Sequence, residues 1–404
     1  MPRSLLEHTV GQLARSVDRA FAQTALRPSA LTRGSSRAES LSPAARLRAL
    51  SLVRAFYAGP DTLEREGRFL PRPERISPTL TRVRRLGSAG EVLDLRWPSE
   101  FEPLWSVEGL QSRLDAMGPE ELVGAGLPAR PDATALLREL GIDRRADLRE
   151  KYLRARGNQT AHARWFRHAD GPRPCAVVLH GYLGGNYAIE ERVWPVRRLF
   201  EGGLDVVLTV LPLHGPRRSE ARGLRPPAFP SSDPRFTIEG LRQLVFDHRA
   251  LFDYLRAGAT TGVGLMGMSL GGFGAALLST LEADLRFSVL WIPLAGIELF
   301  AHEHGRMNGD VSEQLAQRDA LTAAQWSVSP LARPSLVPSD RVVIVAGEHD
   351  RVTGLPHAHR LAAHFGAPVS RFAGSHLLMF GRERAFEPVW SMLEHEGYRP
   401  AVKP

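Results

Sequence analysis

The sequence contains very little cysteine and very little lysine, and it has no hydrophobic run of membrane-spanning length. Cys175, the single cysteine among 404 residues, cannot form an intramolecular disulfide and cannot supply the several thiolates of a structural zinc site. Without an apolar segment of about 20 residues, nothing in the chain favours a transmembrane helix, and the N-terminus lacks the apolar core of a signal peptide. We therefore expect a cytoplasmic protein that holds no metal.

The positive charge comes almost entirely from arginine. Lys151 and Lys403 are the two lysines, and the formal net charge is +8. A basic protein of this kind binds nucleic acid when its charge is clustered, but here the arginines are spread along the chain and no nucleic-acid motif is present. We expect no nucleic-acid partner. The sequence does not predict the oligomeric state.

Residues 1–150 are expected to form a mostly helical region that packs on or caps the rest of the chain. Helical spacing relates Leu6, Val10, Leu13, Val17 and Phe21, with Arg15, Asp18 and Arg19 on the opposite face. A helix with this pattern packs on the body of the protein, and peripheral membrane contact is the less favoured alternative. After a break at 34–36, the pattern predicts helices at 43–57, 106–117 and 132–140 and a strand at 91–97.

Residues 151–400 alternate apolar strand-like runs with helical patterns, which predicts a mainly parallel sheet with helices on both faces. Two long insertions, near 212–235 and 295–335, interrupt this alternation. Loops of this length usually carry function, so we expect them to be lid or acyl-pocket elements.

The most informative motif is Gly267-Met268-Ser269-Leu270-Gly271. It lies between an apolar strand at 263–266 and a helical run at 272–278, and a serine in such a sharp turn projects its hydroxyl from the sheet edge. Gly267 and Gly271 leave room where a Cβ would collide with neighbouring backbone. Ser269 is therefore the candidate nucleophile, although a packing junction between strand and helix would also be rich in glycine.

A serine nucleophile needs a base, and the base needs an orienting acid. The predicted strand at 341–347 is followed by Asp350, and the predicted strand at 369–372 is followed by His376. Asp350 is the expected acid and His376 the expected base, because each follows a successive strand in the required order. Glu298, which follows another predicted strand, stays open as an alternative acid.

Backbone N–H groups should stabilise the oxyanion of the tetrahedral intermediate. One is expected from Leu270, at the start of the helix after the nucleophile, and the other from Tyr182, in the loop after the strand at 176–179. His180 is expected to brace this loop by hydrogen bonds, and Gly181 to give it its turn.

Taken together, His180-Gly181, the turn around Ser269, Asp350 and His376 resemble the α/β-hydrolase superfamily of serine esterases and lipases over about residues 160–395. The segment 211–218 is similar to one in the abhydrolase-18-type group and in dienelactone-hydrolase-like esterases. Within it, Arg217 and Arg218 are candidate contacts for an acidic substrate group.

The resemblance implies the α/β-hydrolase fold and a cofactor-independent carboxylic ester hydrolase that forms an acyl-enzyme on a small-molecule or lipid-like ester. A serine peptidase or acyltransferase is the alternative within enzymes. A non-catalytic binding or scaffold protein is the alternative of another class, because fold alone does not establish activity.

Overall fold

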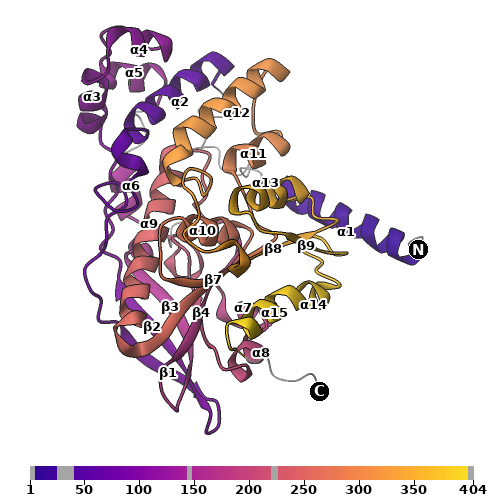
Figure 1. The fold of residues 1–404 in the computed structure, drawn as a ribbon. Coiled ribbons are helices and arrows are strands. Elements are labelled where there is room, and N and C mark those ends of the chain that lie inside the picture. Colours follow the sequence, from indigo (N-terminus) through magenta and orange to yellow (C-terminus); the bar gives the residue numbers. More distant parts are fainter. Residues whose placement is uncertain (1–4, 25–40, 143–147, 220–225, 399–404) are drawn as a thin grey trace.

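The structure is a computed structural model, and it describes residues 5–24, 41–142, 148–219 and 226–398. The described strands form one sheet in the order β1-β2-β3-β5-β4-β6-β7-β8-β9 (Figure 1). The strands are β1 (Thr79–Arg85), β2 (Gly90–Pro98), β3 (Thr160–His168), β4 (Arg173–Leu179), β5 (Asp205–Thr209), β6 (Thr260–Met268), β7 (Leu285–Trp291), β8 (Val342–Gly347) and β9 (Val369–Phe372). Strands β5 to β9 and β4 run parallel to one another, whereas β1, β2, β3 and β5 pair antiparallel in turn.

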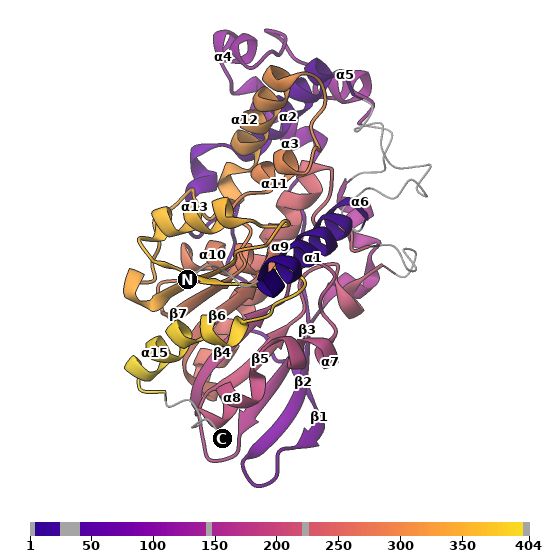
Figure 2. The ribbon, with the colours of Figure 1, turned by 90° about the vertical axis from the view of Figure 1, so that its right-hand side faces the viewer.

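Helices cover both faces of this sheet (Figures 1 and 2). They are α1 (Leu5–Thr24), α2 (Pro43–Tyr57), α3 (Val107–Asp115), α4 (Pro119–Gly124), α5 (Ala133–Glu139), α6 (Leu148–Leu153), α7 (Tyr187–Val193), α8 (Val196–Glu201), α9 (Pro234–Tyr254), α10 (Leu270–Ser279), α11 (Ile297–Glu303), α12 (Val311–Gln325), α13 (Leu355–Phe365), α14 (Arg382–Ala385) and α15 (Glu387–His395). None of the described helices combines the length and the apolar character needed to cross a membrane.

The central strands are buried on both faces, and their side chains alternate between two cores. On β4, Val177 and Leu179 pack into the core that includes α9 and α10, whereas Ala176 and Val178 pack into the core that includes α8 and α15. This follows from the twofold periodicity of a strand covered by helices on each side. The prediction of an α/β-hydrolase fold is confirmed by this architecture.

The sequence pattern located most of the elements near the site. The strand predicted at 369–372 and the helix predicted at 43–57 have the observed bounds, and the strand predicted at 341–347 is β8. The break at 34–36 lies outside the described residues. The pattern did not predict β1, whose seven residues are all exposed and therefore give no burial periodicity.

The first 150 residues also contribute to the sheet, because β1 and β2 extend it through β3. Apolar residues from both parts of the chain share one core, including Phe56, Trp105, Val177 and Leu244. The division placed at residue 150 therefore does not coincide with a break in the sheet or in the core.

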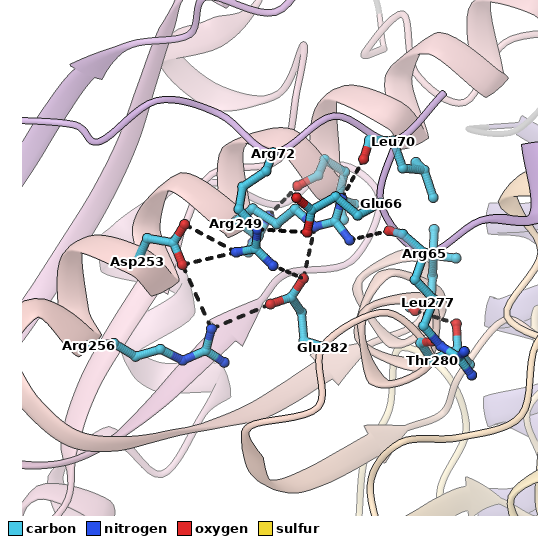
Figure 3. A network of polar contacts seen from close by, with 12 residues as sticks. Arg65, Glu66, Leu70, Arg72, Arg249, Asp253, Arg256, Leu277, Thr280 and Glu282 are labelled. Atoms are coloured by element: carbon cyan, nitrogen blue, oxygen red, sulfur yellow. Dashed lines mark hydrogen bonds and ion pairs between the residues drawn. The ribbon is translucent and has the colours of Figure 1, made fainter. Parts of the chain in front are cut away.

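A network of polar contacts also joins residues 65–72, which precede β1, to α9 and to Glu282 (Figure 3). Arg249, on α9, lies 2.8 Å from Glu282 and donates to the carbonyl of Leu70 at 2.6 Å. Arg72, from the same segment as Leu70, pairs with Asp253 on α9 at 3.1 Å. Glu282 also lies 3.4 Å from Arg256 and 3.8 Å from Arg72, so one buried carboxylate is shared by three arginines, and these contacts fix the segment in place.

The insertion at 295–335 forms α11 and α12, and α12 lies beside α2 (Figure 1). Arg46 on α2 donates to the carbonyl of Arg306 at 2.8 Å, just before α12. This part of the chain therefore packs on the N-terminal region. A lid function for the insertion stays a prediction.

Candidate active site

Ser269 occupies a strained turn between β6 and α10. Its backbone has φ 54° and ψ −113°, a conformation that residues other than glycine rarely adopt. A Cβ at Gly267 would overlap the carbonyl oxygen of Gly271, and a Cβ at Gly271 would overlap that of Leu179. The two glycines therefore permit a close approach of backbones that positions Ser269 at the end of β6.

The loop after β7 holds this turn from the other side. The amide of Ser269 donates to the carbonyl of Trp291 at 3.0 Å, and the amide of Leu294 donates to the carbonyl of Ser269 at 3.1 Å. Between them lies Ile292, a buried β-branched residue with φ 39° whose amide donates to Val345 on β8 at 2.7 Å. Two neighbouring strand ends thus each carry a non-glycine residue with positive φ, and local hydrogen bonds hold both residues in this conformation.

Asp350 and His376 lie together at the ends of β8 and β9. His376 Nδ1 lies 2.9 Å from Asp350 Oδ2, and Asp350 Oδ1 accepts from the amides of Val352 and Thr353 at 2.7 and 2.8 Å. Both side chains are buried, with exposed fractions of 5% for Asp350 and 7% for His376. The carboxylate is therefore held by its backbone donors in an orientation that faces the imidazole.

The charges of this pair stabilise each other. Burial raises the pKa of Asp350, but His376 and the backbone donors lower it more, so the pKa lies below its ordinary value. Burial lowers the pKa of His376, but the Asp350 charge, the hydrogen bond to Asp350 and the Asp18 charge raise it above its ordinary value. With Nδ1 donating to Asp350, the neutral ring carries its lone pair on Nε2.

Thr353 connects this pair to the loop behind Ser269. Its hydroxyl lies 2.8 Å from the carbonyl of Ile292, 3.2 Å from Asp350 Oδ2 and 3.2 Å from His376 Nδ1. The described residues include no hydrogen bond between the Ser269 hydroxyl and His376. The strands β6 to β9 are consecutive in the sheet. Ser269, Asp350 and His376, which follow β6, β8 and β9, therefore lie at the same edge.

The loop after β4 lies against the Ser269 turn. A Cβ at Gly181 would lie 3.5 Å from the Cβ of Ser269. Tyr182 follows Gly181 directly, and Leu270 begins α10, where the first backbone N–H groups have no partner within the helix. The two amides expected to bind the oxyanion thus belong to the segments that flank Ser269, and their role stays a prediction.

His180 joins the loop after β4 to the loop after β5. Its Nε2 accepts from the amide of Leu211 at 3.0 Å, so Nδ1 carries the proton and donates to the carbonyl of Gly181 at 2.7 Å. Burial lowers the pKa of His180 to about 4, so the ring is neutral near pH 7. The neutral ring therefore links the loop after β4, which contacts the Ser269 turn, to the loop after β5.

The placement of Arg217 does not agree with the expectation that it contacts an acidic substrate group. Its side chain is 1% exposed and lies 2.7 Å from Asp247, and it also donates to the carbonyls of Asn158 and Val210. Its charge is already paired inside the core, so we assign Arg217 a structural role. Arg218 is half-buried, and a substrate contact there stays a prediction.

Glu298 lies in the first turn of α11, 3.4 Å from Arg360 on α13. Among the described residues His376 pairs with Asp350 and not with Glu298, so the geometry favours Asp350 as the acid. An open cavity of about 400 Å³ adjoins Glu298, Arg318 and Arg360, and none of its lining residues is Ser269, Asp350 or His376.

Two residues beside the site were not predicted from the sequence. Thr353 gave no signal because it lies in an irregular loop, and Asp18 was expected on the polar face of its helix. Asp18 is fully buried, whereas Leu13, expected on the apolar face, is 61% exposed. The expected orientation of this helix is therefore wrong, because the helix docks on backbone amides of the loops after β8 and β9.

No family model matches this sequence. Two uncharacterized proteins of Mycobacterium tuberculosis, Rv2627c of strain H37Rv and MT2702 of strain CDC 1551, are each 32% identical over 263 residues. The match covers 63% of this chain and 62% of each relative, so the chain spans less than two thirds of their length.

Several solved structures are similar in fold. An acetyl xylan esterase from Paenibacillus sp. R4 is 13% identical, with 81% of this chain and 90% of that chain covered and a TM-score of 0.48. Est1E from Butyrivibrio proteoclasticus, in a structure with bound ferulic acid, is 16% identical (59% and 96% covered, TM-score 0.41). An esterase from the archaeon Pyrobaculum calidifontis is 19% identical (65% and 98% covered, TM-score 0.39).

Identities this low do not transfer a substrate, so function has to be argued from the residues of the site. The sheet order, the strained serine turn after β6 and the acid and histidine after β8 and β9 together identify the fold of this chain as the α/β-hydrolase fold.

Proposed function

We propose that the chain is a serine hydrolase that cleaves carboxylic esters through Ser269, His376 and Asp350. The observation that carries the proposal is the coincidence of a strained serine turn with a buried carboxylate–imidazole pair at the same sheet edge. Backbone strain of the kind seen at Ser269 costs stability and is typical of functional sites, and here it occurs at the sheet edge that also carries the Asp350–His376 pair.

In the proposed reaction, Ser269 Oγ attacks the ester carbonyl carbon while His376 Nε2 accepts the hydroxyl proton. The N–H groups of Leu270 and Tyr182 donate to the oxyanion of the tetrahedral intermediate. Its collapse breaks the bond to the alcohol oxygen, and the imidazolium returns the proton to the departing alcohol. Water then attacks the acyl-enzyme by the same steps and releases the acid.

Asp350 keeps its charge throughout. Its hydrogen bond fixes His376 with Nδ1 protonated, and its charge stabilises the imidazolium that exists during each proton transfer. The two backbone donors to Asp350 Oδ1 keep the carboxylate in place while the imidazole changes charge.

The test is hydrolysis of p-nitrophenyl esters of graded acyl length by the wild type, Ser269→Ala and His376→Ala, together with labelling by a fluorophosphonate probe. We expect labelling and turnover in the wild type and loss of both in Ser269→Ala. Asp284→Asn, at an exposed position before β7, is a control that should keep full activity.

The same experiment separates the alternatives. Product formation that depends on an added alcohol or amine would indicate an acyltransferase, and cleavage of amide substrates would indicate a peptidase. A wild-type protein that neither hydrolyses the esters nor labels at Ser269 would contradict the proposal and favour a binding protein.

A further inference from the structure

The first helix, α1, lies against the loops that carry the candidate acid and base (Figure 2). Among residues 11–22, whose burial the structure describes, the buried positions are Gly11, Ala14, Asp18 and Ala22, which recur at helical spacing on one face. Three of these residues are small, so the helix can approach the loops closely. The remaining residue, Asp18, is an aspartate whose side chain has no exposed surface.

Asp18 accepts four hydrogen bonds from these loops. Its Oδ1 accepts from the hydroxyl of Ser375 at 2.9 Å and from the amide of Leu377 at 3.1 Å. Its Oδ2 accepts from the amide of His376 at 2.9 Å and from the amide of Arg351 at 3.1 Å. Both oxygens are thus fully used, and every donor is within one residue of Asp350 or His376.

These bonds join two separate loops through one side chain. Arg351 directly follows the acid in the loop after β8, and residues 375–377 surround the base in the loop after β9. Each donor would otherwise be a polar group near the protein interior that needs a partner. In the loop after β9, backbone N–H groups that would be paired within a strand or helix thus have Asp18 as their acceptor.

A second contact fastens the same helix. A Cβ at Gly11 would overlap the ring of His349, and Arg15 donates to His349 Nδ1 from Nε at 3.2 Å and from Nη2 at 3.0 Å. His349 directly precedes Asp350. Two turns of α1 thus contact the loop of the acid, and this docking places Asp18 beside the loop of the base.

We propose that Asp18 is a positioning residue for His376, and that docking of α1 is what holds the base in its working orientation. The proposal rests on the proposed serine hydrolase function. It assigns to a helix more than 300 residues away in sequence a direct effect on the candidate catalytic histidine.

The charge of Asp18 also acts on the base. Asp350 and Asp18 raise the pKa of His376 against the lowering effect of burial. Arg15 and His349 face each other on the adjacent part of the same interface. Loss of the Asp18 charge should therefore lower the pKa of His376, an effect that a purely structural contact would not produce.

The test compares Asp18→Asn, Gly11→Leu and the control Arg19→Gln in the full-length chain. Asparagine has the shape of aspartate, but its NH₂ group cannot accept, so at least one backbone amide loses its partner. Gly11→Leu leaves Asp18 intact and blocks docking at the other contact. Arg19 is exposed on the same helix.

The measurements are kcat and KM for a p-nitrophenyl ester, the pH dependence of kcat/KM, and hydrogen exchange of peptides that contain Arg351 and residues 375–377. For Asp18→Asn and Gly11→Leu we expect faster exchange, a fall in kcat of about 10-fold to 100-fold with little change in KM, and an acid limb at lower pH. Arg19→Gln should match the wild type in all three.

An active Asp18→Asn protein with unchanged kcat and an unchanged acid limb would overturn the proposal, even if exchange became faster. If Asp18→Asn does not fold, Gly11→Leu still tests the docking. Failure of the proposed function would look different, because the wild type itself would then neither hydrolyse esters nor label with the fluorophosphonate.

Discussion

His376 Nδ1 lies 2.9 Å from Asp350 Oδ2, and the other oxygen of that carboxylate is occupied by two backbone N–H groups. The carboxylate cannot rotate away from the imidazole without breaking both backbone bonds. The imidazole is therefore fixed as the Nδ1–H tautomer, which leaves Nε2 free to accept a proton.

Asp350→Asn should lower kcat about 10³-fold to 10⁴-fold, because an amide in this place no longer fixes the Nδ1–H tautomer or stabilises the imidazolium. The measurement is steady-state hydrolysis of a p-nitrophenyl ester, with Asp284→Asn as the matched control. Retained activity in Asp350→Asn, with loss of activity in Glu298→Gln, would instead identify Glu298 as the acid.

The pH profile should follow the ionisation of His376. Its pKa is raised in the folded protein, so the neutral ring that can act as base becomes the main form only at a pH above the ordinary imidazole pKa of about 6.5. We expect kcat/KM to rise with pH through a midpoint above that value. A midpoint clearly below 6.5 in a fully folded sample would contradict this assignment.

The raised pKa of His376 also affects stability, which should fall over the pH range in which kcat/KM rises. A raised folded-state pKa stabilises the fold fully below the unfolded pKa, and this contribution is lost as pH rises through the folded pKa. The urea midpoint of the wild type should therefore fall more between pH 6 and pH 8 than that of His376→Ala. This comparison needs no substrate and so is independent of activity.

The sequence predicted the fold and the triad candidates because their signals are local. The glycines around Ser269, and the apolar runs that end just before Asp350 and His376, can be recognised within about ten residues. Asp18 could not be recognised in this way. Its partners lie more than 330 residues away, and helical periodicity alone places an aspartate on the solvent side.

The burial of Arg217 is another feature that the local sequence does not indicate. An arginine in a loop rich in proline and arginine is usually solvated, and nothing nearby in sequence identifies Asp247 on α9 as its partner. Burial of a charge depends on tertiary packing, so the correct role of such a residue needs the fold.

Gly271→Ala should destabilise the protein by about 3 kcal/mol, at the upper end of the usual cost of overpacking, because the new Cβ would overlap the backbone carbonyl oxygen of Leu179. Thermal unfolding measures this effect. The control is Gly124→Ala at the end of α4, where a Cβ would have nothing within 4 Å. If the two variants unfold at the same temperature, the backbones do not approach as closely as described.

Arg217→Met should destabilise the fold by about 3–5 kcal/mol, because it leaves the Asp247 carboxylate buried without its partner. Burial already raises the pKa of Asp247, and loss of the arginine would raise it further. The double variant Arg217→Met with Asp247→Leu removes both charges and should recover much of the loss, which urea unfolding can measure. If Arg217 instead contacted an acidic substrate group, the single variant would be as stable as the wild type and would raise KM for acidic esters alone. A structural role therefore predicts a change in the free energy of unfolding, and a substrate contact predicts a change in KM. Measurements on the single and double variants distinguish the two roles.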